Sequence, residues 1–446
     1  MLPFANCRFI FFICRVNILE SISRRIPFQV KVLIKKFFGL LSDDDSDEET
    51  VKSIQVLENI ALGLMMTRRG HRQDETSYVQ PHFHFKNNLI RFVSILNFIR
   101  FYLILIYNQN DNLSILLGNP FFHENSSDIM ICYVIGGGIT LFVFREYVLY
   151  VEDTRAYPVL CTLRDIKVSG FDSNMLKLTT KQCKWFRSTF HLLITIWIRW
   201  IYCVFICTPF ALIILRIQNQ AIVNSGPAMY ISHFCWIVLE SCTFIFIFGS
   251  FLNLAAHVTV SIPLYLCRLK SLIELLKRVR SKQFIDDSII KGMNTDVISY
   301  MNEFDKNIVT IRYLFFFVFI LVSFGADTAI FLGLSTKGHS KWVSNMLVIR
   351  GLLVLFIVGS IVYVGSATLD QLYVIHGLYV SIIAKASVKL EQKLKTLEIL
   401  DRILSPYCGA KVGDAFRGEK LLAVYYVLEN ASTIMLLICN LQFISS

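Results

Sequence analysis

The chain has 446 residues, of which 54% are hydrophobic, and it carries a formal net charge of +11. A soluble domain does not hold this many apolar residues in long uninterrupted segments, so a membrane protein is expected. The excess Lys and Arg residues fall between the apolar segments, where they would face anionic lipid, and we therefore expect no nucleic-acid partner.

Seven apolar segments are long enough to cross a bilayer. The hydrocarbon core is about 30 Å thick, and a helix that rises 1.5 Å per residue needs about 20 residues to span it. The segments are 89–107, 129–149, 187–215, 229–262, 311–333, 343–367 and 421–444. The first segment contains Arg91 and Arg100, so we expect Arg91 to reach the inner interface and Arg100 to face protein or water.

The loops between these segments differ in their content of basic residues. Segments 108–128 and 217–227 contain no Lys or Arg, whereas 151–187, 263–312 and 368–420 are rich in them. Basic loops remain in the cytoplasm, which predicts a cytoplasmic amino terminus and an extracellular carboxyl terminus.

Two glycosylation sequons support this orientation. They begin at Asn112 and Asn125, and both lie in the first loop that lacks basic residues. Sequons are modified on the luminal side, so this loop is expected outside the cell and the protein is expected to be a glycoprotein.

The predicted cytoplasmic segments are amphipathic rather than plain loops. Apolar residues recur at helical spacing through 264–284 and 377–404, with basic residues between them. We expect an all-α fold in which helices 4, 5 and 6 extend into a cytoplasmic anchor bundle, the sixth continuing to Leu404. That bundle would be part of one subunit or an oligomerisation platform.

The predicted organisation follows from these segments. An acidic linker at 42–50 is too poor in apolar residues to fold. We expect a cytoplasmic amino-terminal region with this linker at 1–88, helices 1–4 at 89–262 and a cytoplasmic helical extension at 263–310. These are followed by helices 5 and 6 at 311–367, a cytoplasmic anchor segment at 368–420 and the last helix at 421–446.

Charged residues inside the apolar segments suggest two ion pairs. Arg199 and Glu240 fall at similar predicted depth, and so do Asp327 and Arg350. Either pair could fix the register of two helices, or contribute to a polar ligand pocket in the outer half of the membrane.

Aromatic residues in the spans are weaker candidates for that pocket. The pocket candidates, with the second ion pair included, are Trp200, Trp236, Asp327, Arg350 and Tyr363. The outer halves of the spans are rich in Phe, Ile and Leu, which favours an apolar or mixed ligand.

Enzymatic and metal chemistry are not expected. The predicted cytoplasmic segments contain no P-loop, no nucleophile-and-base arrangement and no Cys pair with metal-ligand spacing. We therefore predict no catalytic residue, no metal and no cofactor. The 12 cysteines avoid the predicted outer loops, so a disulfide framework is not expected either.

The last segment resembles a known family. It ends in Ile438-Cys439-Asn440-Leu441-Gln442-Phe443, and the seven-span plan with an inner amino terminus resembles that of the insect gustatory receptors. Their signature is Thr-Tyr, five apolar residues and Gln-Phe. Gln442 and Phe443 match it, whereas Met435 and Leu436 occupy the Thr-Tyr positions.

The resemblance implies a taste receptor that acts as a ligand-gated, nonselective cation channel. It would be a homo- or hetero-tetramer in the plasma membrane of a sensory neuron dendrite, opened by a small-molecule tastant and conducting Na⁺, K⁺ and Ca²⁺ amid membrane lipid. Met435, Cys439 and Gln442 share one helical stripe, with Phe443 adjacent, and are the expected pore and gate residues. A non-channel protein such as a small-molecule transporter is the alternative.

Overall fold

The computed structural model describes residues 47–445 except 74, 76–77, 108–109, 123–126, 156, 219–226, 336–340, 387, 406–407, 410, 415 and 418. At the end of the last helix, in 440–445, only the backbone is described. Within these residues helices predominate and the strands form one short hairpin, so the predicted all-α class is confirmed.

Seven helical segments of the described chain are long and apolar enough to cross a membrane. The fifth is α13 continued through the π-helical turn η1 (Val318–Val322) into α14. The helices are α5 (Phe83–Ile106), α7 (Ser127–Thr154), α10 (Thr180–Ile217), α12 (Pro227–Arg280), α13 (Asp287–Phe317) with α14 (Ser323–Ser335), α15 (Lys341–Ile383) and α17 (Lys420–Ser445). These seven coincide with the seven apolar segments of the sequence.

Shorter elements connect them. They are α4 (Asp47–Gly63), α6 (Asp111–Leu116), α8 (Pro158–Ser169), α9 (Ser173–Leu176), α16 (Leu390–Leu404) and the antiparallel strands β1 (Lys411–Val412) and β2 (Phe416–Arg417). The prediction of an unfolded linker at 42–50 is wrong for Asp47–Thr50, which form the first turn of α4. Acidic residues favour a helix amino terminus, and Thr50 is fully buried.

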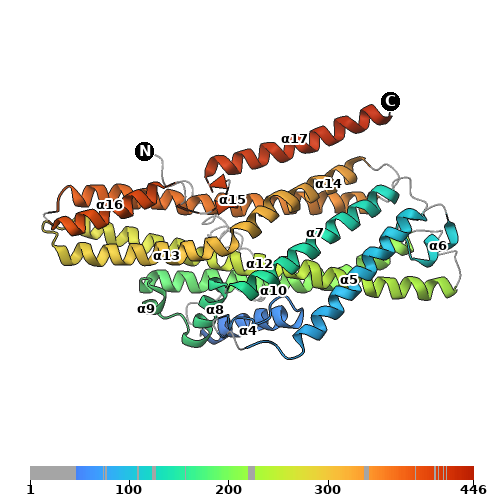
Figure 1. Ribbon diagram of the computed structural model, residues 1–446, viewed down its shortest axis with the longest axis horizontal. Coiled ribbons are helices and arrows are strands. Elements are labelled where there is room, and N and C mark those ends of the chain that lie inside the picture. Colours follow the sequence, from blue (N-terminus) through green and yellow to red (C-terminus); the bar gives the residue numbers. More distant parts are fainter. Residues whose placement is uncertain are drawn as a thin grey trace, which may run out of the picture.

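Three of the spanning helices, α12, α13 and α15, run well beyond their apolar segments. α12 extends along the molecule to the end that carries α13 and α16, and α6 lies at the opposite end (Figure 1). At the α16 end, Asn294 of α13 hydrogen-bonds Thr396 of α16, and Arg402 pairs with Asp305 at 2.7 Å. The predicted continuous extension of α15 to Leu404 is wrong, because α15 ends at Ile383 and α16 begins as a separate helix at Leu390.

The helix pair α14–α15 is packed closely through glycine. A Cβ atom added to Gly333 would lie 2.6 Å from the Ser344 carbonyl, and one added to Gly351 would lie 2.6 Å from the Ala326 carbonyl. The absence of side chains at these positions lets the two helix backbones approach each other. This pair is the platform on which α17 rests.

Candidate ligand-binding site

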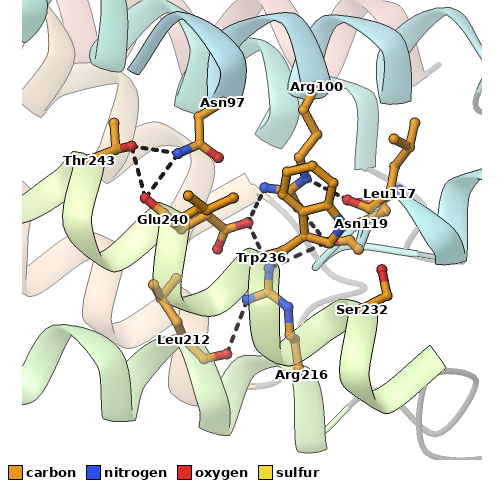
Figure 2. Close-up of polar contacts among 12 residues, drawn as sticks. Asn97, Arg100, Leu117, Asn119, Leu212, Arg216, Ser232, Trp236, Glu240 and Thr243 are labelled. Carbon is orange, nitrogen blue, oxygen red and sulfur yellow. Dashed lines mark hydrogen bonds and ion pairs between the residues drawn. The ribbon is translucent and has the colours of Figure 1, made fainter. Parts of the chain in front are cut away.

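Two arginines converge on one carboxylate between the spanning helices at the α6 end. Arg100 of α5 donates from Nη1 to Glu240 Oε1 of α12 at 2.5 Å, and Arg216 of α10 donates from Nη2 to the same oxygen at 2.6 Å (Figure 2). All three side chains are almost completely buried. We call these three residues the arginine cluster.

The turn after α6 completes the cluster with backbone carbonyls. Arg100 donates from Nε to the Leu117 carbonyl at 2.5 Å and from Nη2 to the Gly118 carbonyl at 2.7 Å. Gly118 has a positive φ of 70°, and a Cβ atom there would lie 2.7 Å from Trp236 Cδ1. Glycine is therefore required both by the backbone conformation and by the close approach of Trp236.

Trp236 covers the cluster. Its ring centroid lies 4.6 Å from the Arg100 guanidinium carbon, and its Nε1 donates to the Leu116 carbonyl at 3.0 Å (Figure 2). A tryptophan ring attracts a cation through its π face, so Trp236 stabilises Arg100 as a charged group.

The arginine cluster carries an excess of positive charge. Two guanidinium groups share one carboxylate, which leaves a formal charge of about +1 buried between the helices. The carbonyl oxygens of Leu117 and Gly118 offset part of this charge through their dipoles. His233, two turns before Glu240 on the same face of α12, is buried with both ring nitrogens lacking a hydrogen-bond partner among the described residues.

A cavity of about 360 Å³ lies beside the arginine cluster, between α5, α7, α10, α12 and α15. Its walls are mainly aromatic and aliphatic, with Phe98, Phe101 and Phe244 among them. Glu240 borders it, and so does Arg350, whose guanidinium lies 6.0 Å from the Phe244 ring centroid. An apolar cavity of this size with a few polar groups is typical of small-molecule sites.

Asn97 gives the cavity a polar group without a partner. Its Nδ2 donates to the Leu239 carbonyl at 2.9 Å and to Thr243 Oγ1 at 2.5 Å. Its Oδ1 is buried with no hydrogen-bond partner among the described residues. Asn97 and Glu240 both line the cavity, so a ligand with an apolar body and a hydrogen-bonding group would meet polar side chains there.

The predicted ion pair between Arg199 and Glu240 is wrong. Arg216 occupies the carboxylate, and Arg199 precedes it by 17 residues, or roughly 25 Å along the same helix. That separation exceeds the reach of an arginine side chain. The prediction rested on counting residues from the ends of the apolar segments, and this count placed Glu240 deeper in the membrane, and farther from the α6 end, than the structure does.

The predicted pair of Asp327 and Arg350 is also not formed. Asp327 is buried on α14 one turn beyond Ser323, which hydrogen-bonds Tyr426 of α17. Arg350 instead stacks over Phe244 and Phe248 of α12, so the two charges lie on different sides of the α14–α15 pair.

The remaining predicted pocket residues are dispersed. Trp236 covers the arginine cluster, but Trp200 is 40% exposed on α10 and Tyr363 is half-buried on α15, and neither lines the 360 Å³ cavity. Of the five candidates, only Arg350 lines it.

Only some of the predicted pore and glycosylation residues have a described side chain. Met435 is 69% exposed and Cys439 is exposed on α17, whereas the side chains of Gln442 and Phe443 lie outside the described residues. Asn112 is exposed on α6. The other sequon asparagine, Asn125, lies outside the described residues.

A second set of buried polar side chains lies where α4, α8 and α12 meet. His71 Nε2 is 3.2 Å from His257 Nε2, and Lys167 donates to Glu58 Oε2 at 2.8 Å. Glu58 Oε1 also accepts from the His71 backbone N–H at 2.9 Å. We call Glu58, His71, Lys167 and His257 the histidine cluster; it ties α4, α8 and α12 together. Among the described residues, no group of three or more His, Cys, Asp or Glu side chains could hold a metal ion.

The hydrogen bonds of the histidine cluster fix its protonation. His257 Nδ1 lies 2.7 Å from the Asn253 carbonyl and must donate to it, so its Nε2 accepts a hydrogen bond from His71 Nε2–H. Burial, followed by the neighbouring His257, lowers the pKa of His71 to about 3. Burial would raise the pKa of Glu58, but His71 and Lys167 together hold it below its ordinary value.

No protein-family model matches this chain, and a search of curated proteins returns no match. Its function must therefore be argued from its own residues.

Proposed function

We propose that the chain is a subunit of a plasma-membrane cation channel that a small molecule opens, in the manner of the insect gustatory receptors. Several copies, four by the resemblance, would place α17 around a shared pore. The ligand would occupy the 360 Å³ cavity, and the seven spans would hold it in the outer half of the membrane.

The observation that carries the proposal is the position of α17. This helix packs mainly against α14 and α15 and leaves most of its apolar surface uncovered. Seven of its large apolar side chains are more than half exposed: Leu421, Val424, Tyr425, Val427, Leu428, Met435 and Leu436. A helix at the edge of its subunit is in position to meet copies of itself across an axis.

The cavity supports a ligand-gated function. It is lined by helices from both halves of the chain, and α15, which supplies Arg350, also contacts α17. A ligand that binds better to one arrangement of these helices would shift the position of α17, because differential affinity is what couples a ligand to a conformation.

The test is whole-cell current from cells that express the chain alone, with surface labelling to confirm delivery. A panel of small neutral alcohols and amides with apolar bodies should evoke a cation current, and Phe443→Ala should raise the current without ligand. Surface-delivered protein that carries no current in either form, but takes up a compound of the panel, would support the transporter instead.

Asn97→Ala tests the cavity in the same cells. Loss of the buried acceptor removes about 1–1.5 kcal/mol, so the concentration for half-maximal current should rise about tenfold. Asn88→Ala is the matched control, because Asn88 lies on the same helix but is exposed and away from the cavity. An equal change in both variants would contradict the assignment of the site.

A further inference from the structure

One carboxylate interrupts the apolar surface of α17. Glu429 is the single charged residue between Lys420 and the end of the helix. Its side chain is exposed, and it forms no ion pair among the described residues. Lys420, by contrast, is paired with Asp370 at 2.6 Å.

Contacts of the preceding turn fix the depth of Glu429. Tyr426 hydrogen-bonds Ser323 at 2.8 Å, and its ring lies 5.0 Å from that of Phe319. Both residues are near the centre of the apolar segment 311–333. Glu429 follows Tyr426 by three residues, a rise of about 4.5 Å, so it lies close to the middle of the bilayer core.

Neighbouring exposed residues continue the stripe on which Glu429 lies. Tyr425, Glu429, Ser432, Leu436 and Cys439 follow one another at spacings of four and three residues, and all are exposed. Residues at these spacings occupy one face of a helix. This stripe therefore combines a carboxylate, a hydroxyl and a thiol on an otherwise apolar helix.

We propose that this stripe faces a water-filled axis shared with other copies of the chain, where the Glu429 side chains form a ring that attracts cations. The inference rests on the proposed channel function and names the group that favours cations. A carboxylate facing lipid at mid-membrane is strongly disfavoured, so the stripe requires water or protein. α14 and the π-helical turn before it contact α17 through the face that carries Tyr426, and Glu429 lies about 60° around the helix from that residue, beside the contact. Further copies of the chain would enclose the water on this open side.

The first test measures ion selectivity. Reversal potentials under a NaCl gradient should show that Glu429→Gln lowers the preference for Na⁺ over Cl⁻ at least threefold, whereas Glu429→Asp retains it. A conducting Glu429→Gln channel with unchanged selectivity would overturn the ring and leave the channel function standing.

The second test needs no current. In a Cys439→Ser background, Glu429→Cys should react with a membrane-impermeant cationic methanethiosulfonate reagent, because thiolate forms only where water reaches. Val427→Cys is the control: Val427 is 63% exposed at nearly the same depth but projects about 160° away around the helix. Absence of labelling at position 429, or equal labelling at both, would falsify the water-filled stripe.

Oxidative cross-linking tests the second copy. Leu436→Cys, in the same background, should give a product of twice the subunit mass, and Val427→Cys should not. A labelled Glu429→Cys protein without current would retain the aqueous stripe and reject ligand-gated conduction. Absence of the cross-link at position 436 would reject copies of the chain as its enclosure.

Discussion

The arginine and histidine clusters bury similar polar groups with different consequences. In the arginine cluster, two cations share one carboxylate oxygen beside a cavity of about 360 Å³. In the histidine cluster, one lysine meets one carboxylate, the imidazoles are neutral, and the cavity next to His257 has a volume of about 30 Å³. The first has unbalanced charge beside space for a ligand, whereas the second is balanced and has room for about one water molecule.

This difference suggests different roles. A buried group with unbalanced charge responds to any polar molecule that enters beside it, because the interior screens charge poorly. A balanced group between tightly packed helices fixes their positions. We therefore regard the arginine cluster as a group that responds to a bound ligand, and the histidine cluster as a fixed connection between α4, α8 and α12.

Glu240→Gln should produce the largest effect. It leaves two buried guanidinium groups without a counter-charge, at a cost of about 3–5 kcal/mol in the free energy of unfolding. The expected result is a large fall in melting temperature in detergent. Arg216→Met added to Glu240→Gln should restore part of the loss, since the cluster then returns to one excess charge.

Glu58→Gln is the comparison for that prediction. Its partner Lys167 is 28% exposed and can turn to water, so the loss should be clearly smaller than for Glu240→Gln. Equal losses in the two variants would remove the distinction between the clusters.

Gly118→Ala should follow in magnitude. The left-handed backbone costs about 1–3 kcal/mol for a residue with a side chain, and the clash with Trp236 adds a similar amount. Thermal unfolding should show a loss of about 2–6 kcal/mol. Gly136→Ala is the control, because a Cβ atom there meets nothing within 4 Å and alanine favours a helix. A tolerated Gly118→Ala would mean that the turn does not position the arginines.

The pH dependence of stability should give the smallest effect. His71 has a folded pKa of about 3, below its ordinary value of about 6.5, so the unfolded chain binds more protons between these values. Stability contributed by neutral His71 is present above pH 6.5 and is lost as the pH falls below it. At pH 5 the loss is about 2 kcal/mol at most.

His71→Gln should remove this part of the pH dependence. Melting temperatures from pH 7.5 to pH 5 should fall less steeply in His71→Gln than in the unmodified protein. His84→Gln should retain the full slope, since His84 is exposed. A slope unchanged by His71→Gln would show that His71 is not held neutral in the fold.

The spans were predictable because crossing a membrane depends on a local property, the length of an apolar segment. The helices agree with the seven segments, and Arg100 inside the first segment faces protein, as its charge requires. The folding of Asp47–Thr50 could not be foreseen, because it depends on tertiary contacts such as that of Thr50 Oγ1 with His191 Nδ1.

The candidate site was less predictable. Residue counting gives approximate depth but not the rotation of a helix or the path of a loop, and both bring Arg100, Arg216 and Glu240 together. Gly118-Asn119-Pro120 did carry a turn signal, which could have indicated that a loop folds back at this point. Asn97 gave no signal, because one amide in an apolar segment does not reveal its neighbours.

The length of α12 has a mechanical consequence. From Glu240 to Arg280 the helix extends for 40 residues, or about 60 Å. Pro263 lies within this stretch and cannot donate a backbone hydrogen bond, so the helix lacks one hydrogen bond there. A tilt of about 5° at the arginine cluster would carry the far end sideways by about 5 Å if the helix stayed rigid. α12 would therefore amplify a small tilt at the arginine cluster into a larger displacement near Arg280. The stiffness of the helix at Pro263 sets how much of that displacement reaches Arg280.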